Sequence, residues 1–354
     1  MIKIREADEA DNDALLGLQK KSPMGVSLIL AVDSSPDYFA RSRPYDNWKV
    51  FVATENQRIV GSAACAIKEL LVQGKPVKTA FEYGFMIDPQ ERRKGIATQL
   101  QKHIENFAHH QDAELLHLFI LKENLPSMKL FQKMGFECVK DCLTLSTMVY
   151  KEENVQNETN IKNVGSVNIE DVVSMINEAY YDYEFYSPFD KASFQQYTER
   201  LPHYKQEDIL VFQRRKDVIA CLGFWNHSKI TRISPEKAPS RLKALSYMTK
   251  LLSLFAKVPK IPEIGKTIKQ WYLFPVAYRD ANALTELIKQ VNNMALRNDV
   301  GMLTMTLDCD SPIISVLSRF RNIKVKTHYF LKSLGQIDLS TLKEKEFYID
   351  VVDI

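Results

Sequence analysis

The first 150 residues alternate between short apolar strands and amphipathic helices. Residues 1–5 alternate in polarity as a strand does, and residues 11–21 place their apolar side chains on one helical face. Two apolar segments, 48–54 and 58–64, flank the polar turn 55–57, which predicts a β-hairpin. The chain therefore opens with a strand, a helix and a hairpin.

A strand at residues 81–87 leads through a basic turn into a longer helix. The helix is predicted because apolar positions recur at spacings of three and four, at Ile96, Leu100, Ile104 and Phe107. A compact apolar stretch at 114–121 has the length of a strand, and a second helix follows it. Asn124 is suited to cap that helix and Gly135 to end it.

The second half of the chain repeats this order. The corresponding segments are the hairpin 208–224, the strand 269–275, the helix 283–295 and the strand 302–307. An insertion at 227–267, whose apolar positions from Leu242 to Phe255 predict a helix, separates the second hairpin from its strand. The agreement in order predicts two copies of one fold.

Length and a change in composition predict the domain boundaries. A chain of 354 residues is longer than one hydrophobic core usually supports. Residues 151–163 are rich in Glu, Asn, Gln and Thr and poor in bulky apolar side chains, which predicts an exposed linker. We therefore expect domains at 1–150 and 164–354.

The basic turn before the first long helix has the chemistry of a phosphate-binding helix start. Backbone N–H groups at a helix N-terminus have no partner within the helix, and with the helix dipole they favour an anion. Arg92, Arg93 and Lys94 add positive charge, while Gly95 and Ala97 leave room for a pyrophosphate to approach the backbone. The alternative is a basic turn that merely begins a surface helix.

Two motifs resemble those of the GNAT superfamily of acyl-CoA-dependent N-acyltransferases. The segment 92–97 matches the family pattern Arg/Gln-x-x-Gly-x-Gly/Ala, and it follows an Ile-Asp-Pro approach. The segment 124–136 is similar to the family's Asn-x-x-x-x-x-Leu-Tyr-x-Lys-x-Gly-Phe. The resemblance implies an α/β (α+β) fold of two tandem domains, each a mixed, mostly antiparallel twisted sheet flanked by helices.

The resemblance also implies a function and a set of site residues. It implies direct transfer of an acetyl group from acetyl-CoA, used as co-substrate, to an amine on a small molecule or peptide. The residues expected to contact the cofactor are Met86, Ile87, Arg92, Arg93, Lys94, Gly95, Ile96, Ala97, Thr98, Asn124 and Phe131. A further resemblance is to a GNAT subgroup with long polypeptides, which includes plant Hookless-like proteins. It implies that Met24, Tyr38 and Phe39 shape the acceptor pocket. Packing of Tyr38 and Phe39 on the sheet is the alternative.

Two catalytic residues are expected near the end of the strand 81–87. An alkylamine is almost fully protonated at neutral pH, so the reaction gains from a base, and Glu82 is the leading candidate. A solvent-facing glutamate at the strand end is the alternative. The resemblance implies that splayed strands leave the main-chain N–H of Ile87 free to stabilise the thioester oxygen.

One position departs from the family pattern. The tyrosine of the second motif, which the resemblance implies would protonate the leaving thiolate, is Phe131, and a phenyl ring donates no proton. The thiol pKa lies near 8.5, so leaving as thiolate at pH 7 costs about 2 kcal/mol, which is small beside an acyl-transfer barrier. Acyl transfer without this acid, or with another hydroxyl, is therefore expected to proceed.

The second copy lacks the phosphate-binding chemistry. Its loop, 277–283, contains no glycine and places Asp280 where the anion would lie. Like charge at that point opposes binding of CoA. The sequence therefore predicts one active site, in the N-terminal domain, and a degenerate second domain that completes the structure or the acceptor site.

Composition excludes several other classes. A net charge of +3 is too small to indicate nucleic-acid binding, and no membrane segment or signal peptide is visible. The five cysteines include no Cys-x-x-Cys pair, so no metal site is expected and a reducing cytoplasm is favoured. The composition is compatible with a monomer and with an oligomer.

Two alternative functions stay open. Phe131 motivates the first, a non-catalytic acyl-CoA-binding sensor or assembly protein that would bind CoA without releasing thiol. The second is an aminoacyl-transferring relative of the peptidoglycan-bridge enzymes, which also have paired GNAT-like domains. That function does not require the segment 92–97, whose presence counts against it.

Overall fold

The computed structural model describes residues 2–252, 256–259 and 261–354. The first half contributes strands β1 (Lys3–Glu6), β3 (Asn47–Glu55), β4 (Arg58–Val72), β5 (Lys75–Ile87), β6 (Leu115–Leu121) and β7 (Glu137–Met148), with helices α1 (Asn12–Lys20), α2 (Ile96–His110) and α3 (Leu125–Lys133). Each predicted element of this half lies at its expected place. Met1, which was included in the first predicted strand, lies outside the described residues.

The second half follows the same order of elements. Its strands are β8 (Ile161–Asn163), β9 (Ile209–Arg214), β10 (Asp217–Trp225), β12 (Gln270–Tyr278), β13 (Met302–Asp308) and β14 (Asn322–Ser333), and its helices are α4 (Ile169–Tyr180), α5 (Lys191–Arg200), α7 (Ala281–Arg297) and α8 (Ile313–Leu317). The predicted fold class, a mixed and mostly antiparallel sheet flanked by helices, is confirmed.

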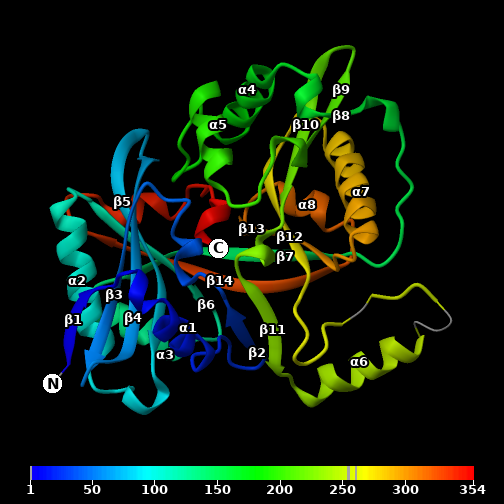
Figure 1. Cartoon of the computed structure of the whole chain (residues 1–354). Helices are drawn as coiled ribbons and strands as arrows, with labels where there is room; N and C mark the ends of the chain where they lie inside the picture. Colours follow the sequence, from blue (N-terminus) through cyan, green and yellow to red (C-terminus); the bar gives the residue numbers. More distant parts are fainter. Residues whose placement is uncertain (1, 253–255, 260) are drawn as a thin grey trace.

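The two halves share one 12-stranded sheet, which crosses the molecule in Figure 1. Its order is β1-β3-β4-β5-β6-β14-β7-β13-β12-β10-β9-β8. Strand β14 of the second half is antiparallel to β6, and β7 of the first half is antiparallel to β13. The last strand of each half thus completes the sheet of the other half, an exchange that the sequence does not predict.

Both halves contain the same splayed pair of parallel strands. Strands β5 and β6 pair only from Thr79↔Leu115 to Phe81↔His117, although β5 continues to Ile87. Strands β12 and β13 likewise pair over three positions, beginning at Gln270↔Met302. Beyond these points the strands separate, which leaves main-chain groups unpaired in the gap.

Both halves also contain the same β-bulge beside the splay. In the first half Gly84 and Phe85 together oppose Ala63, and in the second half Phe274 and Pro275 oppose Gly223. A Cβ atom on Gly223 would lie 2.1 Å from the carbonyl oxygen of Phe274, so only glycine fits there. Because the splay and the bulge recur, the second half is a structural copy of the first.

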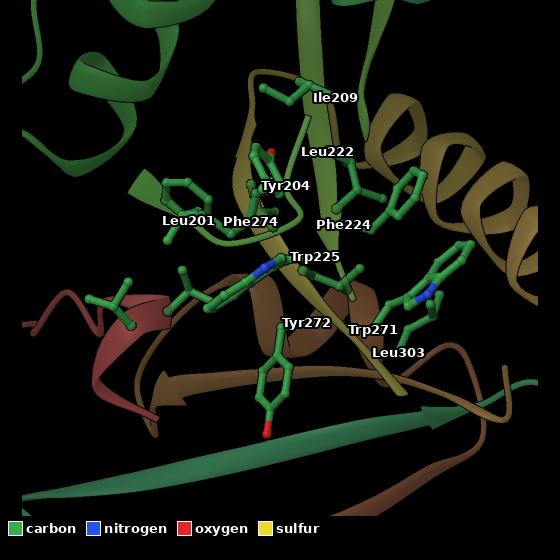
Figure 2. Packing of buried hydrophobic residues seen from close by; sticks show 14 of the residues in the cluster. Leu201, Tyr204, Ile209, Leu222, Phe224, Trp225, Trp271, Tyr272, Phe274 and Leu303 are labelled. Carbon is green, nitrogen blue, oxygen red and sulfur yellow. Dashed lines mark hydrogen bonds between the residues drawn. The ribbon is translucent and has the colours of Figure 1, made fainter. Parts of the chain in front are cut away.

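The hydrophobic core lies on both faces of the sheet. On one face, helix α2 buries the predicted stripe, with Leu100 and Ile104 fully buried. In the second half, Phe224 and Trp271 stack with ring centroids 4.4 Å apart, and Trp225 lies in the same cluster (Figure 2). Trp225 donates a 2.8 Å hydrogen bond to the Pro202 carbonyl. Apolar burial of this kind stabilises both halves.

The insertion in the second half reaches back to the first half. Strand β11 (Arg232–Lys237) pairs antiparallel with β2 (Ile29–Asp33) in a separate two-stranded sheet. Helix α6 (Ser240–Leu252) follows on the outside of the molecule (Figure 1), and Phe255 of the predicted helix lies outside the described residues. No helix in the part of the chain that the structure describes is long and apolar enough to cross a bilayer.

The predicted linker lies along helix α7. Its end, from Ile161, forms strand β8. The backbone N–H of Glu153 donates a 2.8 Å hydrogen bond to the side chain of Asn293. The boundaries at 150 and 164 stay a prediction, because one sheet runs through both halves.

Candidate active site

The basic turn has the backbone of an anion-binding helix start. Gly95, at the N-cap of α2, is left-handed with φ 76°, and Arg93 also has a positive φ of 67°. A Cβ atom on Gly95 would meet no other atom within 4 Å, so the space in front of the loop is open. The first N–H groups of α2, beginning at Ile96, point out of the helix start, as such groups do.

The charges of this loop are not equally available to a ligand. Lys94 pairs with Glu91, and Arg58 binds the same carboxylate at 2.8 Å. The Nε of Arg92 donates to the Ile87 carbonyl at 3.3 Å. Among the described residues Arg93 forms no ion pair, and it is exposed together with Gly95 and Thr98. Arg93 is therefore the cation most available to a pyrophosphate.

The loop residues fit the diphosphate of CoA. The open space at Gly95, the unpaired Arg93 and the helix start converge on one point at the end of β5. Ala97 is small and half-buried, and Ile96 is anchored in the core at 2 % exposure. These residues would hold the diphosphate through main-chain N–H groups and one guanidinium.

Glu82 lies on the α2 face of strand β5. Its side chain is 2 % exposed and accepts a 2.7 Å hydrogen bond from Gln101 of α2. Burial raises the pKa of Glu82 to about 8. Its second carboxyl oxygen is buried without a hydrogen-bond partner among the described residues. The carboxyl is therefore protonated at neutral pH.

The bulge explains why Glu82 lies on that face. Tyr83 and Met86 both line a pocket on the opposite face of β5, although three positions separate them. The extra residue at Gly84–Phe85 reverses the alternation of side chains, since strand faces otherwise repeat every two residues. This placement argues against Glu82 as the base, because a general base must reach the acceptor amine.

The second motif lies against the end of β5. Asn124 caps α3 by accepting from the Ser127 N–H at 3.3 Å. Phe131 is 5 % exposed, and its ring meets that of Phe85 edge to face, with centroids 5.1 Å apart. The family's tyrosine position therefore faces the splayed strand, but it carries no hydroxyl.

The pocket on the opposite face of β5 is lined by residues of α1, β4, β5 and the segment that follows β2. Tyr38 lines it, and its hydroxyl lies 3.3 Å from that of Ser62. Phe39 is packed instead in the core beside Trp48, with ring centroids 6.0 Å apart. Met24 is 43 % exposed and does not line this pocket. Only Tyr38 of the three predicted acceptor residues is thus at the pocket.

Most of the polar residues of the pocket are not predicted by any pattern in the sequence. These come from helix α1, from the segment that follows β2 and from β5: Gln19, Ser34, Arg41, Ser42 and Tyr83. The hydroxyl of Tyr83 donates to Ser42 at 2.7 Å, and Gln19 and Ser34 exchange hydrogen bonds of 2.9 and 3.1 Å. They belong to no shared motif, so no spacing pattern could have found them.

The equivalent loop of the second half is closed to anions. Asp280 caps α7 by accepting from the Asn282 N–H at 2.9 Å, and Arg214 pairs with the same carboxylate at 2.9 Å. A pocket at the β12–β13 splay is lined by the end of the chain, including Val351 and Ile354. The second copy therefore offers neither a free helix start nor an open splay.

A group of possible metal ligands lies away from the pocket, on β7 and β14. One ligand atom each of Cys138, Asp141 and His328 lies within 4.8 Å of the others. His328 Nδ1 already lies 2.6 Å from the Asp141 carboxylate. A hydrogen bond between these two side chains accounts for their contact.

Comparison with known proteins agrees with this geometry. Residues 24–136 match the model of the acetyltransferase (GNAT) family. No curated protein matches the sequence. Solved structures of similar fold include Saccharomyces cerevisiae N-myristoyltransferase with bound myristoyl-CoA, at TM-score 0.63 and 12 % identity over 99 % of this chain and 85 % of that chain.

A second similar structure is a GCN5-related N-acetyltransferase from Sphaerobacter thermophilus, at TM-score 0.61 and 11 % identity over 96 % of this chain and 98 % of that chain. A putative acetyltransferase from Pyrococcus horikoshii matches at TM-score 0.57 and 10 % identity, over 99 % and 95 % of the two chains. At such identities these structures show the shared fold. The chain therefore contains, at residues 24–136, a domain that matches the acetyltransferase (GNAT) family.

Proposed function

We propose that this protein transfers an acetyl group from acetyl-CoA directly to an amine acceptor, at a single site in its N-terminal half. The observation that carries the proposal is the contrast between the two helix starts. Gly95 leaves the start of α2 open beside Arg93, which has no ion-pair partner among the residues that the structure describes. Asp280, in contrast, blocks the start of α7 with its own carboxylate.

The splay supplies the main-chain chemistry. Strand β5 continues past its last pair with β6, Phe81↔His117, to Ile87. An N–H group in this gap, for which Ile87 stays the predicted residue, would stabilise the oxygen of the attacked thioester. Met86 lies in the pocket lining at the same place, so the acceptor amine would approach from the pocket.

Aromatic packing around the splay supports a short acyl group. On the pocket face Phe81 and Tyr83 stack with centroids 5.4 Å apart, and Phe119 stacks on Tyr329 at 4.3 Å. On the other face Phe131 packs against Phe85. Because these rings fill the space beside β5, an acetyl group fits this site better than the myristoyl group bound by the yeast enzyme.

Titration calorimetry with acetyl-CoA tests the cofactor site. We expect the double variant Arg93→Glu, Gly95→Asp to lose affinity by at least about 100-fold, since two carboxylates would face the diphosphate. Arg321→Glu, an exposed arginine on another loop, serves as the control and keeps its affinity. Unchanged affinity in the double variant contradicts the assignment.

A thiol-release assay separates enzyme from sensor. We expect acetyl-CoA to release free thiol with an amine acceptor faster than a long-chain acyl-CoA does. Binding of acetyl-CoA without thiol release on any acceptor would instead identify a sensor.

The five cysteines, all unpaired, support the proposed cytoplasmic location.

A further inference from the structure

The pocket beside the β5 bulge has one charged side chain in its lining, Arg41. Arg41 ends the short helical turn Tyr38–Arg41, which Asp37 caps by accepting from the Phe39 N–H at 2.9 Å. The remaining polar residues of the lining are hydroxyls and one amide, and no lining residue is a carboxylate. The pocket is therefore electropositive.

No residue that the structure describes neutralises the charge of Arg41. Its Nε is buried and has no hydrogen-bond partner, and it forms no ion pair with any residue that the structure describes. The guanidinium carbon lies 5.2 Å from the centre of the Tyr83 ring. This cation–π contact orients the guanidinium but satisfies none of its N–H groups. A buried donor without an acceptor is costly, and a bound anion would remove that cost.

The other polar groups of the pocket have partners within the protein. Tyr83 is bonded to Ser42 and Tyr38 lies near Ser62, so the two phenols are positioned as neutral walls. Burial and, to a smaller extent, the positive charge of Arg41 lower the pKa of His227, in the second half of the chain, to about 3. His227 is therefore neutral. Arg41 is therefore the one charged group of the lining that is available to a ligand.

We propose that Arg41 binds a carboxylate of the acceptor, so that the acceptor is a small amine carrying a carboxylate beside its amino group, as an α-amino acid does. The planar guanidinium matches a carboxylate in a bidentate pair. A single cation suits a monoanion better than a dianionic phosphate. The proposal rests on the proposed acetyltransferase function and names the acceptor class of the same site.

The same charge helps the acceptor to react. An ammonium group close to a guanidinium loses its proton more readily, because like charges disfavour the charged form. Arg41 would therefore lower the pKa of the amino group as well as bind the carboxylate. This effect matters here because the lining contains no ionised carboxylate to act as a base.

The second half of the chain contacts the segment that precedes the Arg41 turn, including Ser34 of the pocket lining. Strand β11 pairs with β2, Arg232 binds Asp33 at 2.7 Å, and Ser34 lies 3.4 Å from Thr231. Burial by itself would raise the pKa of Asp33. Hydrogen bonds from Ser35 and Arg232 outweigh this effect and lower the pKa to about 2. The degenerate copy thus positions one wall of the acceptor pocket.

An acceptor panel tests the proposal with acetyl-CoA and a thiol-release readout. Each amino acid is paired with its amide and with its decarboxylated amine, for example leucine, leucinamide and 3-methylbutylamine, and 2-aminoethylphosphonate represents a phosphorus-containing anion. We expect kcat/KM to be on the order of 100-fold higher for an amino acid than for its amide, as for removal of one partner of a buried ion pair. Amides used as well as acids, preference for the phosphonate, or no binding or turnover of any carboxylate acceptor would overturn the proposal.

Variants of Arg41 separate this proposal from the proposed function. Arg41→Gln should remove the preference for carboxylates by raising KM for them, while acetyl-CoA affinity stays at the wild-type value. Arg41→Lys should retain part of the preference, because lysine keeps the positive charge but cannot form the bidentate pair of a planar guanidinium. Arg43→Gln, an exposed neighbour paired with Asp37, is the control.

The outcomes are distinguishable. Loss of acetyl-CoA binding by wild-type protein, or no thiol release with any acceptor, counts against the acetyltransferase function. Thiol release that Arg41→Gln leaves unchanged for acids and amides alike overturns only the carboxylate proposal. Thermal melting of each variant confirms that it is folded.

Discussion

Gln101 on helix α2 donates a 2.7 Å hydrogen bond to Oε1 of Glu82 on strand β5. The bond directs the carboxyl into the sealed interior between helix and sheet, and Gln101 itself is 2 % exposed. The acceptor pocket lies on the other face of the strand. Glu82 and the pocket are therefore separated by the sheet.

Glu82→Gln should leave turnover near the wild-type rate. The amide keeps the shape of the protonated carboxyl and the hydrogen bond to Gln101, and it lies away from the acceptor amine. Steady-state kinetics at pH 7 with acetyl-CoA measure this. Slower turnover with unchanged CoA affinity would restore Glu82 as the base.

Stability should fall as the pH rises through the titration of Glu82. The folded state, with a pKa of about 8, keeps a proton that the unfolded chain releases above its ordinary value of 4.5. The free energy of unfolding therefore decreases between about pH 4.5 and 8, by at most about 5 kcal/mol at about 1.4 kcal/mol per pH unit. Urea unfolding over this range should show the slope in wild type and a flatter profile in Glu82→Gln. Equal profiles would contradict the buried, protonated carboxyl.

Asp280→Ala should destabilise the fold by about 1 kcal/mol, the usual cost of losing a helix cap. The α7 start loses its acceptor and Arg214 loses its partner. Acetyl-CoA affinity should not change, because this loop is outside the proposed site. Asp182→Ala, an exposed aspartate, is the control for melting. A change in CoA affinity would mean that the second loop contributes to cofactor binding.

Lys68→Met should destabilise the protein strongly at neutral pH. Lys68 binds Asp350 at 2.8 Å and Asp353 at 2.9 Å, and it is almost buried. Removing the cation leaves two acidic groups without their partner, at a cost of about 3–5 kcal/mol. Burial raises the pKa of Asp353 to about 6, so the loss should shrink below that pH as the carboxyl becomes neutral. Lys75→Met, an exposed lysine, is the control, and equal melting of the two variants would contradict the role of Lys68.

A fragment of residues 1–150 should not fold by itself. Without β14, one edge of β6 is unpaired, and an unpaired edge promotes aggregation. Co-expression with residues 151–354 should recover soluble protein with cooperative melting. A monomeric, cooperatively melting fragment would contradict this dependence.

Local patterns predicted the elements and the family well. The stripe from Ile96 to Ile104 forms α2, and the motif at Gly95 lies at the helix start with the left-handed conformation that glycine favours. These features depend on neighbours a few residues away, so periodicity and caps reveal them. The fold class is confirmed, and residues 24–136 match the acetyltransferase (GNAT) family model.

Features that depend on distant contacts could not be predicted. Strands β7 and β14 have patterns that fit either sheet position, so nothing local in them reveals the exchange. The bulge at Gly84 reverses the faces of β5, which alternation alone could not show for Glu82. Arg41 belongs to no motif. Its proposed role in binding an anion rests on its lack of a partner among the described residues, which only the structure shows.

The strand exchange also bears on how the protein is made. Strand β14 ends at Ser333, so strand β6 of the N-terminal half has no partner on one side until the chain has been synthesised as far as residue 333. Contacts so far apart in sequence form slowly, because a long loop must close first. We therefore expect the half that is synthesised first to reach its final form only after translation of the second half.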